Sequence, residues 1–577
     1  MAEQLYFSRD TRLIVQFRNT TDNTETAASL GLGDCWEIPI LDGYSFSQTT
    51  NTSEITLAEM ESTAGVSRRG RRMFTDSLAP AEWSFSTYIR PFKSKAGSPT
   101  PSGTRSADTA AEVHAVEEVL WASMFGADEY SSSLFKRSTA TNPVSGPVVT
   151  PAAAGASPLV STIVATESNR AALHSMTFWF WVDTATDTPL LYRLPEAVVN
   201  DVSVDFDVDG IATLNWSGFA KEVQDRSGNL IVKNVRPTVG NDNVGGEDID
   251  LGDVWIDTGN AQGRVFNLIK SKPNSGQLGT SNVTQAIDEG TASTKNFIRN
   301  RLTSVDIETA DAADKVKTLF AGQHVAITAI DNTNKVFTTD GAHGLTTGDQ
   351  VYITGCTGNI VPNGTHLYVR VGDETSTYAG TTNATTEFAL FDSKAEAENL
   401  GNAGGLHSET YTGSYDTKSG TVANGKYSLT LTGGSFNIAN NITYLVPEEL
   451  GAINKPLEHV TGTRTSTGNA TCYLTLEDTD LTSGTSRQFF NDLVSTDAMS
   501  KVVNKFKVTM HIGGSAATGN ATDPALKIEF PTAHIEVPTH QVEDVISMET
   551  NFQALPSDFG TANEITAITY YPVDDYA

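Results

Sequence analysis

Residues that could support catalysis are scattered along this chain and form none of the usual catalytic arrangements. The ten histidines include no His-x-x-x-His or His-Glu-x-x-His pattern, and neither a Gly-x-Ser-x-Gly nor a phosphate-binding Gly-x-x-x-x-Gly-Lys-Ser/Thr motif occurs. His343 lies in a His-Gly-Leu turn, where we expect the imidazole to stabilise the turn. Asp205 and Asp207 alternate along a predicted strand, so they share one solvated face rather than facing each other across a cleft. The sequence therefore predicts a protein that is not an enzyme.

Metal-binding patterns are equally weak. Cys35, Cys356 and Cys472 are too far apart in the sequence to indicate a zinc site, and we expect them to be small buried residues. The acidic runs 248–250 and 478–480 lack the Gly and bidentate Glu spacing of a dedicated calcium loop. We expect neither a metal ion nor another cofactor.

The most unusual charged segment spans residues 54–92. An acidic stretch is followed by four arginines within five positions, in a chain with 39 basic and 69 acidic residues and a formal net charge of −30. This net charge argues against a nucleic-acid patch, whereas guanidinium groups also form bidentate ion pairs with carboxylates of a neighbouring subunit. A solvated loop is the alternative that the residues leave open. The candidate contact residues are Glu59, Glu61, Arg68, Arg69, Arg71 and Arg72, together with Glu448 and Glu449 in a later loop.

The composition favours β-structure. The 577 residues, 61.7 kDa, are enough for roughly three to four domains. Only 19% of residues are charged and 38% are hydrophobic, while Thr, Ser, Asn and Gly are abundant, which is typical of strands joined by polar turns. No segment is apolar over the length that spans a membrane, and the first ten residues predict no secretory signal.

The pattern of strands and helices occurs twice in the same order. Each copy contains an amphipathic stretch that predicts a helix, at Ala110–Phe125 and at Gln488–Ser500. Seven matches in one order favour an internal duplication over coincidence. The matched pairs are 12–18 with 301–307, 38–46 with 427–436, 83–88 with 471–476, 110–125 with 488–500, 175–182 with 505–512, 189–195 with 524–531 and 211–219 with 545–552.

A further block, residues 324–400, interrupts the second copy. Short alternating strands around Gly348-Asp349 and Asn363-Gly364 predict a small β-barrel or sandwich. The block resembles a module that recurs in bacteriophage virion proteins and is related to the first catalytic-cysteine half-domain of ubiquitin-activating enzymes, where it is structural.

The predicted fold is mainly β, with two antiparallel β-sandwich domains that each carry a flanking helix. Between them lies a Gly-, Asn- and Asp-rich stretch, which is either wrapped on a folded surface or a disordered linker in its middle. The predicted division is 1–223 for the first domain, 224–296 for an extended connection, 297–323 with 401–577 for the second domain and 324–400 for the inserted β-domain.

Two segments resemble the major tail, or tail tube, proteins of tailed bacteriophages. One is the strand Leu78–Phe92 (LAPAEWSFSTYIRPF) with the loop before it, and the other is the loop and strand of the second copy at Tyr444–Gly451 and Val460–Tyr473. The resemblance covers both copies, about 400 residues, without the connection and the inserted block. It implies two packed antiparallel sheets flanked by a helix, and loops at 49–80 and 440–468 that make contacts within and between rings.

The resemblance also implies a structural virion protein, assembled in the host cytoplasm, whose stacked rings form a tube that conducts DNA without binding it specifically. Its partners would be further copies of itself and other tail proteins. If a single-copy tube protein closes a ring with six chains, a duplicated chain needs three, and a hexamer is the alternative. The competing interpretation is a baseplate, fibre or adhesin-type binding protein built from β-domains.

Overall fold

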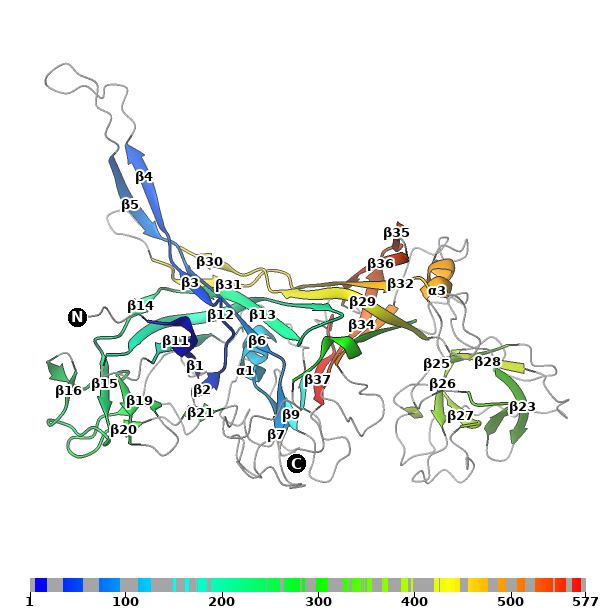
Figure 1. Ribbon diagram of the computed structural model, residues 1–577, viewed down its shortest axis with the longest axis horizontal. Helices are drawn as coiled ribbons and strands as arrows, with labels where there is room; N and C mark the ends of the chain where they lie inside the picture. The colour runs from blue at the N-terminus through cyan, green and yellow to red at the C-terminus, as the bar shows by residue number, and fades with distance from the viewer. Residues whose placement is uncertain are drawn as a thin grey trace, which may run out of the picture.

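A computed structural model describes the parts of the chain that form its sheets and helices (Figure 1). The fold is mainly β, as the composition predicts. The described residues are 6–17, 35–55, 72–93, 113–125, 149–151, 161–164, 173, 175–183, 188–244, 246–259, 264–280, 283–285, 297–309, 325–331, 335–343, 345, 347, 350–354, 366–371, 385–392, 396–397, 420–424, 426–446, 455–475, 486–493, 506–513, 525–542, 545–556 and 563–571.

Two sets of strands share one pairing pattern, and we call them the first and the second repeat. The first repeat contains β1 (Thr11–Phe17), β2 (Cys35–Ile38), β3 (Ser45–Ser47), β6 (Ala81–Tyr88), β11 (Met176–Val182), β12 (Leu190–Asp207) and β13 (Thr213–Ala220). The second contains β22 (Ser304–Thr309), β29 (Lys426–Ala439), β32 (Thr465–Tyr473), β33 (Phe506–Gly513), β34 (Ala525–Ile535), β35 (Thr539–Val542), β36 (Ile546–Ala554) and β37 (Ala567–Tyr571).

Six antiparallel pairings recur in the two repeats. In the first, β1 pairs with β2 and β11, and the ladder continues through β12, β13 and β6 to β3. In the second, β22 pairs with β29 and β33, and the ladder continues through β34, β36 and β32 back to β29. The long strand β29 therefore takes the places of both β2 and β3. The same order of antiparallel pairings thus occurs twice in the described part of the chain.

Alternating side chains give each ladder an apolar and a polar side. Along β6 and β13, every second side chain is buried, including Trp83, Phe85 and Trp216. These side chains belong to one hydrophobic core that extends through both repeats. All seven tryptophans of the chain are buried, and all lie before residue 256, so indole fluorescence reports on the first repeat and the connection.

The described parts of both α-helices are shorter than the helices predicted from the sequence. Helix α1 spans Glu118–Phe125, and the expected earlier turns include the strand β8 (Val113–Ala115), which pairs with β7 (Pro91–Lys93). Helix α3 spans Ser486–Leu493 and begins before the predicted start. Within the described residues, no helix has the length and apolar character needed to cross a bilayer.

The connection after the first repeat forms an additional β-layer. Its sheet contains β15 (Leu230–Lys233), β18 (Val254–Asp257), β19 (Val265–Ser271) and β20 (Gly279–Thr280). Val254, Ile256 and Phe266 of this sheet pack on Trp179 and Trp181 of β11. The connection is thus wrapped on the surface of the first repeat. Smaller strands of this part of the chain are β14 (Gln224–Asp225), β16 (Asn243–Val244), β17 (Glu247–Asp248) and β21 (Val283–Gln285).

The inserted block forms a closed six-stranded barrel with its own core, which includes Phe337 and Phe388. Its last strand lies beyond residue 400, where we predicted that the block would end, because a barrel closes only when its edge strands pair. Figure 1 shows the barrel beside the second repeat, next to α3. Its strands are β23 (Val325–Asp331), β24 (Val336–Thr339), β25 (Gln350–Thr354), β26 (His366–Val371), β27 (Glu387–Phe391) and β28 (Gly420–Asn424).

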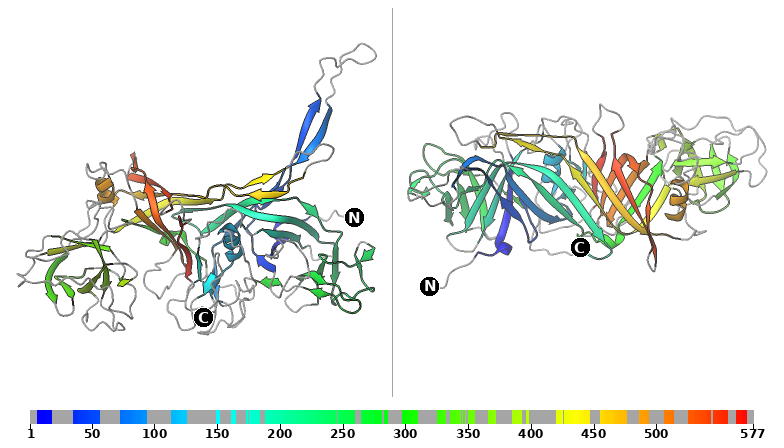
Figure 2. Two further views of the ribbon diagram at one scale, coloured as in Figure 1. Left: turned by 180° about the vertical axis from the view of Figure 1, so that it is seen from behind. Right: turned by 90° about the horizontal axis from the view of Figure 1, so that it is seen from above.

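Equivalent hairpins extend from the two repeats. The first consists of β4 (Thr50–Ile55) and β5 (Arg72–Leu78), between β3 and β6. The second consists of β30 (Thr443–Leu445) and β31 (Glu458–Val460), between β29 and β32. The first hairpin projects beyond the body, whereas the second lies along the first repeat (Figures 1 and 2).

The two repeats are joined through strand pairing. Residues Asp201–Asp207 of β12 pair with Gly433–Ala439 of β29 in antiparallel register. A second contact is made by β10 (Ser161–Val164), which pairs with the C-terminal strand β37 and with β9 (Val149–Pro151). Asn440 is buried at the first junction, where its Nδ2 donates to the carbonyl oxygens of Met124 at 2.8 Å and Val199 at 3.2 Å.

A buried carboxyl group lies where α1 meets β37. The hydroxyl of Tyr570 donates to Glu117 Oε1 at 2.6 Å and accepts from Trp121 Nε1 at 2.6 Å. Burial raises the pKa of Glu117 to about 8, although the hydrogen bond from Tyr570 acts in the opposite direction. At neutral pH, Glu117 is therefore protonated inside the contact between the repeats.

This raised pKa predicts a specific pH dependence of stability. Between the ordinary carboxyl pKa of 4.5 and the folded value of about 8, folded Glu117 retains a proton that the unfolded chain releases. The free energy of unfolding should therefore fall as pH rises through this window, by at most about 1.4 kcal/mol per pH unit. Urea denaturation followed by tryptophan fluorescence should show a shallower fall for Glu117→Gln. Exposed Glu82→Gln is the control, and identical slopes for all three proteins would contradict the assignment.

Candidate functional site

Eight strand segments form one continuous antiparallel surface across both repeats. Their order is β3, β6, β13, β12, β29, β32, β36 and finally the end of β34 with β35. The register places one polar row after another on the side opposite the core. One such row runs across five neighbouring strands and consists of Ser86, Asn215, Ser203, Asn437 and Thr467. We call this side the polar face.

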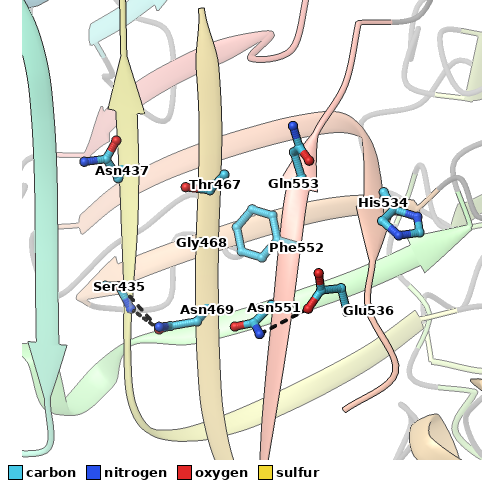
Figure 3. Close-up of a pocket in the computed structure, with 10 residues that line it drawn as sticks. All are labelled: Ser435, Asn437, Thr467, Gly468, Asn469, His534, Glu536, Asn551, Phe552 and Gln553. Atoms are coloured by element: carbon cyan, nitrogen blue, oxygen red, sulfur yellow. Dashed lines mark hydrogen bonds between the residues drawn. The ribbon is translucent and has the colours of Figure 1, made fainter. Parts of the chain in front are cut away.

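Side chains of the polar face bond to one another across the strands. Asn437 Nδ2 donates to Asp201 Oδ2 at 2.8 Å, which connects the repeats, and Ser86 Oγ donates to Asn215 Oδ1 at 2.7 Å. In Figure 3, the side chain of Asn469 lies beside Ser435, whose amide N–H donates to Asn469 Oδ1 at 2.8 Å. These lateral bonds occupy amide and hydroxyl groups and fix their orientation across the sheet.

A shallow pocket lies on the second-repeat half of the polar face (Figure 3). Its lining is mostly amide and hydroxyl groups, and Asn551 Nδ2 donates to Glu536 Oε2 at 3.3 Å along one side. Gly468 forms part of the floor, where an added Cβ would lie 2.5 Å from the Phe552 ring. The close approach of β32 to this ring therefore requires glycine. No group in the pocket forms a catalytic arrangement.

The charge of the polar face has one sign. The eight segments, taken as Ser45–Ser47, Ala81–Tyr88, Asp201–Asp207, Thr213–Ala220, Gly433–Ala439, Thr465–Tyr473, Thr532–Val542 and Ile546–Ala554, contain no lysine or arginine. Burial raises the pKa of Asp201, and the hydrogen bond from Asn437 partly offsets this. The surface thus offers hydroxyls, amides and carboxylates, without a cation to bind phosphate. Its acidic residues are Glu82, Asp201, Asp205, Asp207, Glu536 and Glu549.

Most of the charged loop residues singled out in the sequence fall outside the described parts of the chain. Arg72 is the exception, because its backbone begins β5 and lies opposite Ile55. Both groups belong to equivalent hairpins, since one lies between β4 and β5 and the other between β30 and β31. The residues outside the described parts are Glu59, Glu61, Arg68, Arg69, Arg71, Glu448 and Glu449.

The other candidates have structural surroundings. His343 is buried, and its Nδ1 accepts the Leu345 backbone N–H at 3.0 Å, which is the expected turn contact. Lys272 Nζ lies 3.1 Å from Asp248 and 2.8 Å from Asp250, so an ammonium group occupies the first acidic run. The run 478–480 lies outside the described residues. Among the described residues, no group of three or more His, Cys, Asp or Glu could hold a metal ion.

Part of the chain is similar to a known phage tail protein. No protein-family model matches the chain. The chain is similar to the tail tube protein pb6 of Escherichia phage T5, with 34% identity over 170 residues. This match covers 28% of the present chain and 34% of pb6, so the chain spans about a third of the length of the curated relative that it matches. The similarity supports a phage tail structural role.

The exposed acids of the polar face should contribute little to stability. Asp205 and Asp207 are exposed, so replacing both with asparagine should change the free energy of unfolding by less than about 0.5 kcal/mol per site. Asn440→Ala removes a buried donor and should cost about 1–3 kcal/mol because two carbonyls lose a partner. Urea denaturation of the three proteins tests this contrast. A loss in the double aspartate variant as large as in Asn440→Ala would assign the acids a structural role.

Proposed function

We propose that this chain is a structural protein of a bacteriophage tail and that copies of it form stacked rings of a tail tube through which DNA passes. The polar face is the inner wall of the tube in this proposal. The observation that carries it is a continuous eight-strand sheet whose open side has six carboxylates and no lysine or arginine. Similarity to a tail tube protein supports the same role. The location would be the virion tail, after assembly in the host cytoplasm.

An inner wall of this kind would let DNA slide. Protein affinity for DNA depends on Lys and Arg groups that neutralise phosphates and release counterions. The polar face has none, and its carboxylates repel the phosphates while its hydroxyls and amides bond to one another. The DNA would therefore pass without specific binding.

Three chains would complete one ring. Each chain supplies eight strands to the polar face, so three supply 3 × 8 = 24 strands, with pseudo-six-fold symmetry from the two repeats. At about 4.8 Å between strands, 24 strands give a circumference of roughly 115 Å before tilt widens it. The hexameric alternative needs six chains, each with one repeat lining the channel and the other on the outside. In the same proposal, residues 1–223 and 297–323 with 426–577 form the two tail-tube domains, and the barrel, which ends with β28, is a separate inserted domain.

Electron microscopy of the purified protein tests assembly. Rings or tubes with a central channel are the expected result, and image classification without imposed symmetry should show three chains around the axis. Isolated particles at all protein concentrations would instead favour the baseplate, fibre or adhesin-type alternative. Six chains in one ring would refute the trimer while leaving the tube.

Lysines on the polar face should make the tube bind DNA. Ser203→Lys, Asn437→Lys and Thr467→Lys lie on adjacent strands of one polar row. Three added cations should give salt-sensitive DNA binding, with log affinity falling by about 0.9 per lysine for each decade of salt. The matched control carries glutamine at the same positions. DNA retention by assembled tubes can be measured by sedimentation, and equal retention by lysine and glutamine variants would place this face away from the DNA.

The arginines of the first hairpin are proposed to bond acidic groups of an adjacent chain. Arg68, Arg69, Arg71 and Arg72 would pair with Glu59 and Glu61 or with Glu448 and Glu449 of a neighbour. Exposed ion pairs contribute only about 0–1 kcal/mol each, so the effect must be summed along the tube.

Replacing all four arginines with serine should raise the protein concentration needed for assembly and increase its sensitivity to salt. Light scattering over a salt series measures both quantities. The control replaces four arginines outside the hairpin, Arg9, Arg226, Arg236 and Arg301, with serine. Unchanged assembly of the hairpin variant would remove these residues from the contact.

A further inference from the structure

The junction between the repeats provides a template for a contact between chains. In this junction, β12 and β29 pair over seven consecutive positions, from Asp201 opposite Ala439 to Asp207 opposite Gly433. Val204 and Phe436 are opposite each other and buried on the core side. Two edge strands that would each be open in an isolated repeat are thereby closed against each other.

Each partner in this junction has a counterpart in the other repeat. Ser45 lies opposite Ser84 in the first repeat as Ser435 lies opposite Asn469 in the second, and a phenylalanine follows each serine. The β3 edge therefore corresponds to the Gly433–Ala439 edge of β29.

The second counterpart lies at the other end of the surface. Ser203 is opposite Asn215 of β13, and Thr539 is opposite Glu549 of β36. Asn215 and Glu549 hold matching positions because they lie opposite Ser86 of β6 and Thr471 of β32. The segment 537–542 therefore stands in the second repeat where residues 201–206 stand in the first.

Both counterparts are paired on one side only within the described part of the chain. Strand β3 pairs with β6, and β35 pairs with β36. Ser45, Ser47, Thr539 and Gln541 are exposed, and Val537 beside them is 54% exposed. Open strand edges are sites where another chain adds by backbone hydrogen bonding.

We propose that segment 537–542 of one chain pairs with the β3 edge of the next copy, in the antiparallel register of the internal junction. The proposal rests on the proposed ring-forming function and names its contact. In the internal junction, Asp205 lies opposite Ser435, and the equivalent pair between chains is Gln541 opposite Ser45. Likewise, Ser203 lies opposite Asn437, and the equivalent pair between chains is Thr539 opposite Ser47. Because the two edges are at opposite ends of the eight-strand order, the contact is head-to-tail, which is the kind of contact that a closed ring requires.

The hairpins agree with this arrangement. The second-repeat hairpin lies on the first repeat, where the Tyr444 hydroxyl donates to the Glu196 carbonyl and Lys455 Nζ lies 3.4 Å from Glu222. The equivalent hairpin β4–β5 projects away from the body of its own chain (Figure 1). Its Met73 and Phe74 side chains are 59% and 54% exposed. The same junction between chains would lay the base of this hairpin on the second repeat of the preceding copy, whose segment 537–542 pairs with β3.

Disulfide trapping between chains tests the register. Ser45→Cys and Gln541→Cys are placed in separate chains, each with Cys356→Ser, and the chains are mixed, assembled and oxidised. The buried Cys35 and Cys472 are retained. We expect covalent two-chain products at least about tenfold above those from Asn241→Cys mixed with Gln541→Cys, because pairing raises the effective concentration. Asn241 is exposed and belongs to neither edge. Ser47→Cys with Thr539→Cys is the second pair.

The doubly substituted chain extends the test to ring size. When Ser45→Cys and Gln541→Cys are combined in one chain, oxidation of assembled protein should give a denaturing-gel ladder that ends at the number of chains in a ring. Rings or tubes seen by electron microscopy without crosslinks at either pair would overturn the edge contact but leave the proposed function. Folded protein that remains monomeric and forms no crosslinks would overturn the proposed function itself. Folding of each variant is checked by circular dichroism, because the second repeat contains no tryptophan.

Discussion

The pairing of β12 with β29 determines how the rest of the molecule is arranged. A strand presents alternate side chains to opposite faces, so a shift of one residue at this junction would turn one repeat over relative to the other. In the observed register, Val204 and Phe436 meet in the core, and Ser203 and Asn437 meet on the polar face. One pairing thus gives both repeats a common apolar side and a common polar side.

The surface formed by β1 and β11 in the first repeat differs from the matching surface of β22 and β33 in the second repeat. At matching places in β1 and β11, Ile14 lies opposite Trp179, and the sheet formed by the connection covers this apolar surface. In the second repeat, Asp306 lies opposite Thr509, and His511 Nε2 is 3.5 Å from Asp306. Within the described residues, an additional sheet packs on the first repeat and not on the second. The core and polar face are shared, while the outer surfaces differ.

Local patterns predicted more of this structure than contacts between distant residues did. Alternating hydrophobicity indicated the strands, their repeated order and the inserted block, but it could not reveal that residues 201–207 pair with residues 433–439. It placed Val113–Ala115 in a helix, although pairing with Pro91–Lys93 makes this segment a strand. The shared side of Asp205 and Asp207 was predictable, whereas the full polar face draws a few ordinary side chains from each of eight strands and leaves no motif.

The covalent union of two repeats also restricts which closed assemblies can exist. In the proposed ring, every chain contributes its sheets in pairs, so the number of repeats around the axis is always even. Rings with five or seven repeats, which a slight error in the angle between separate subunits would allow, are excluded by chain connectivity. Half of the contacts around the ring are already made when the chain folds, through β12 and β29. The fused chain therefore allows only rings with an even number of repeats. It also halves the number of junctions that must form between separate chains.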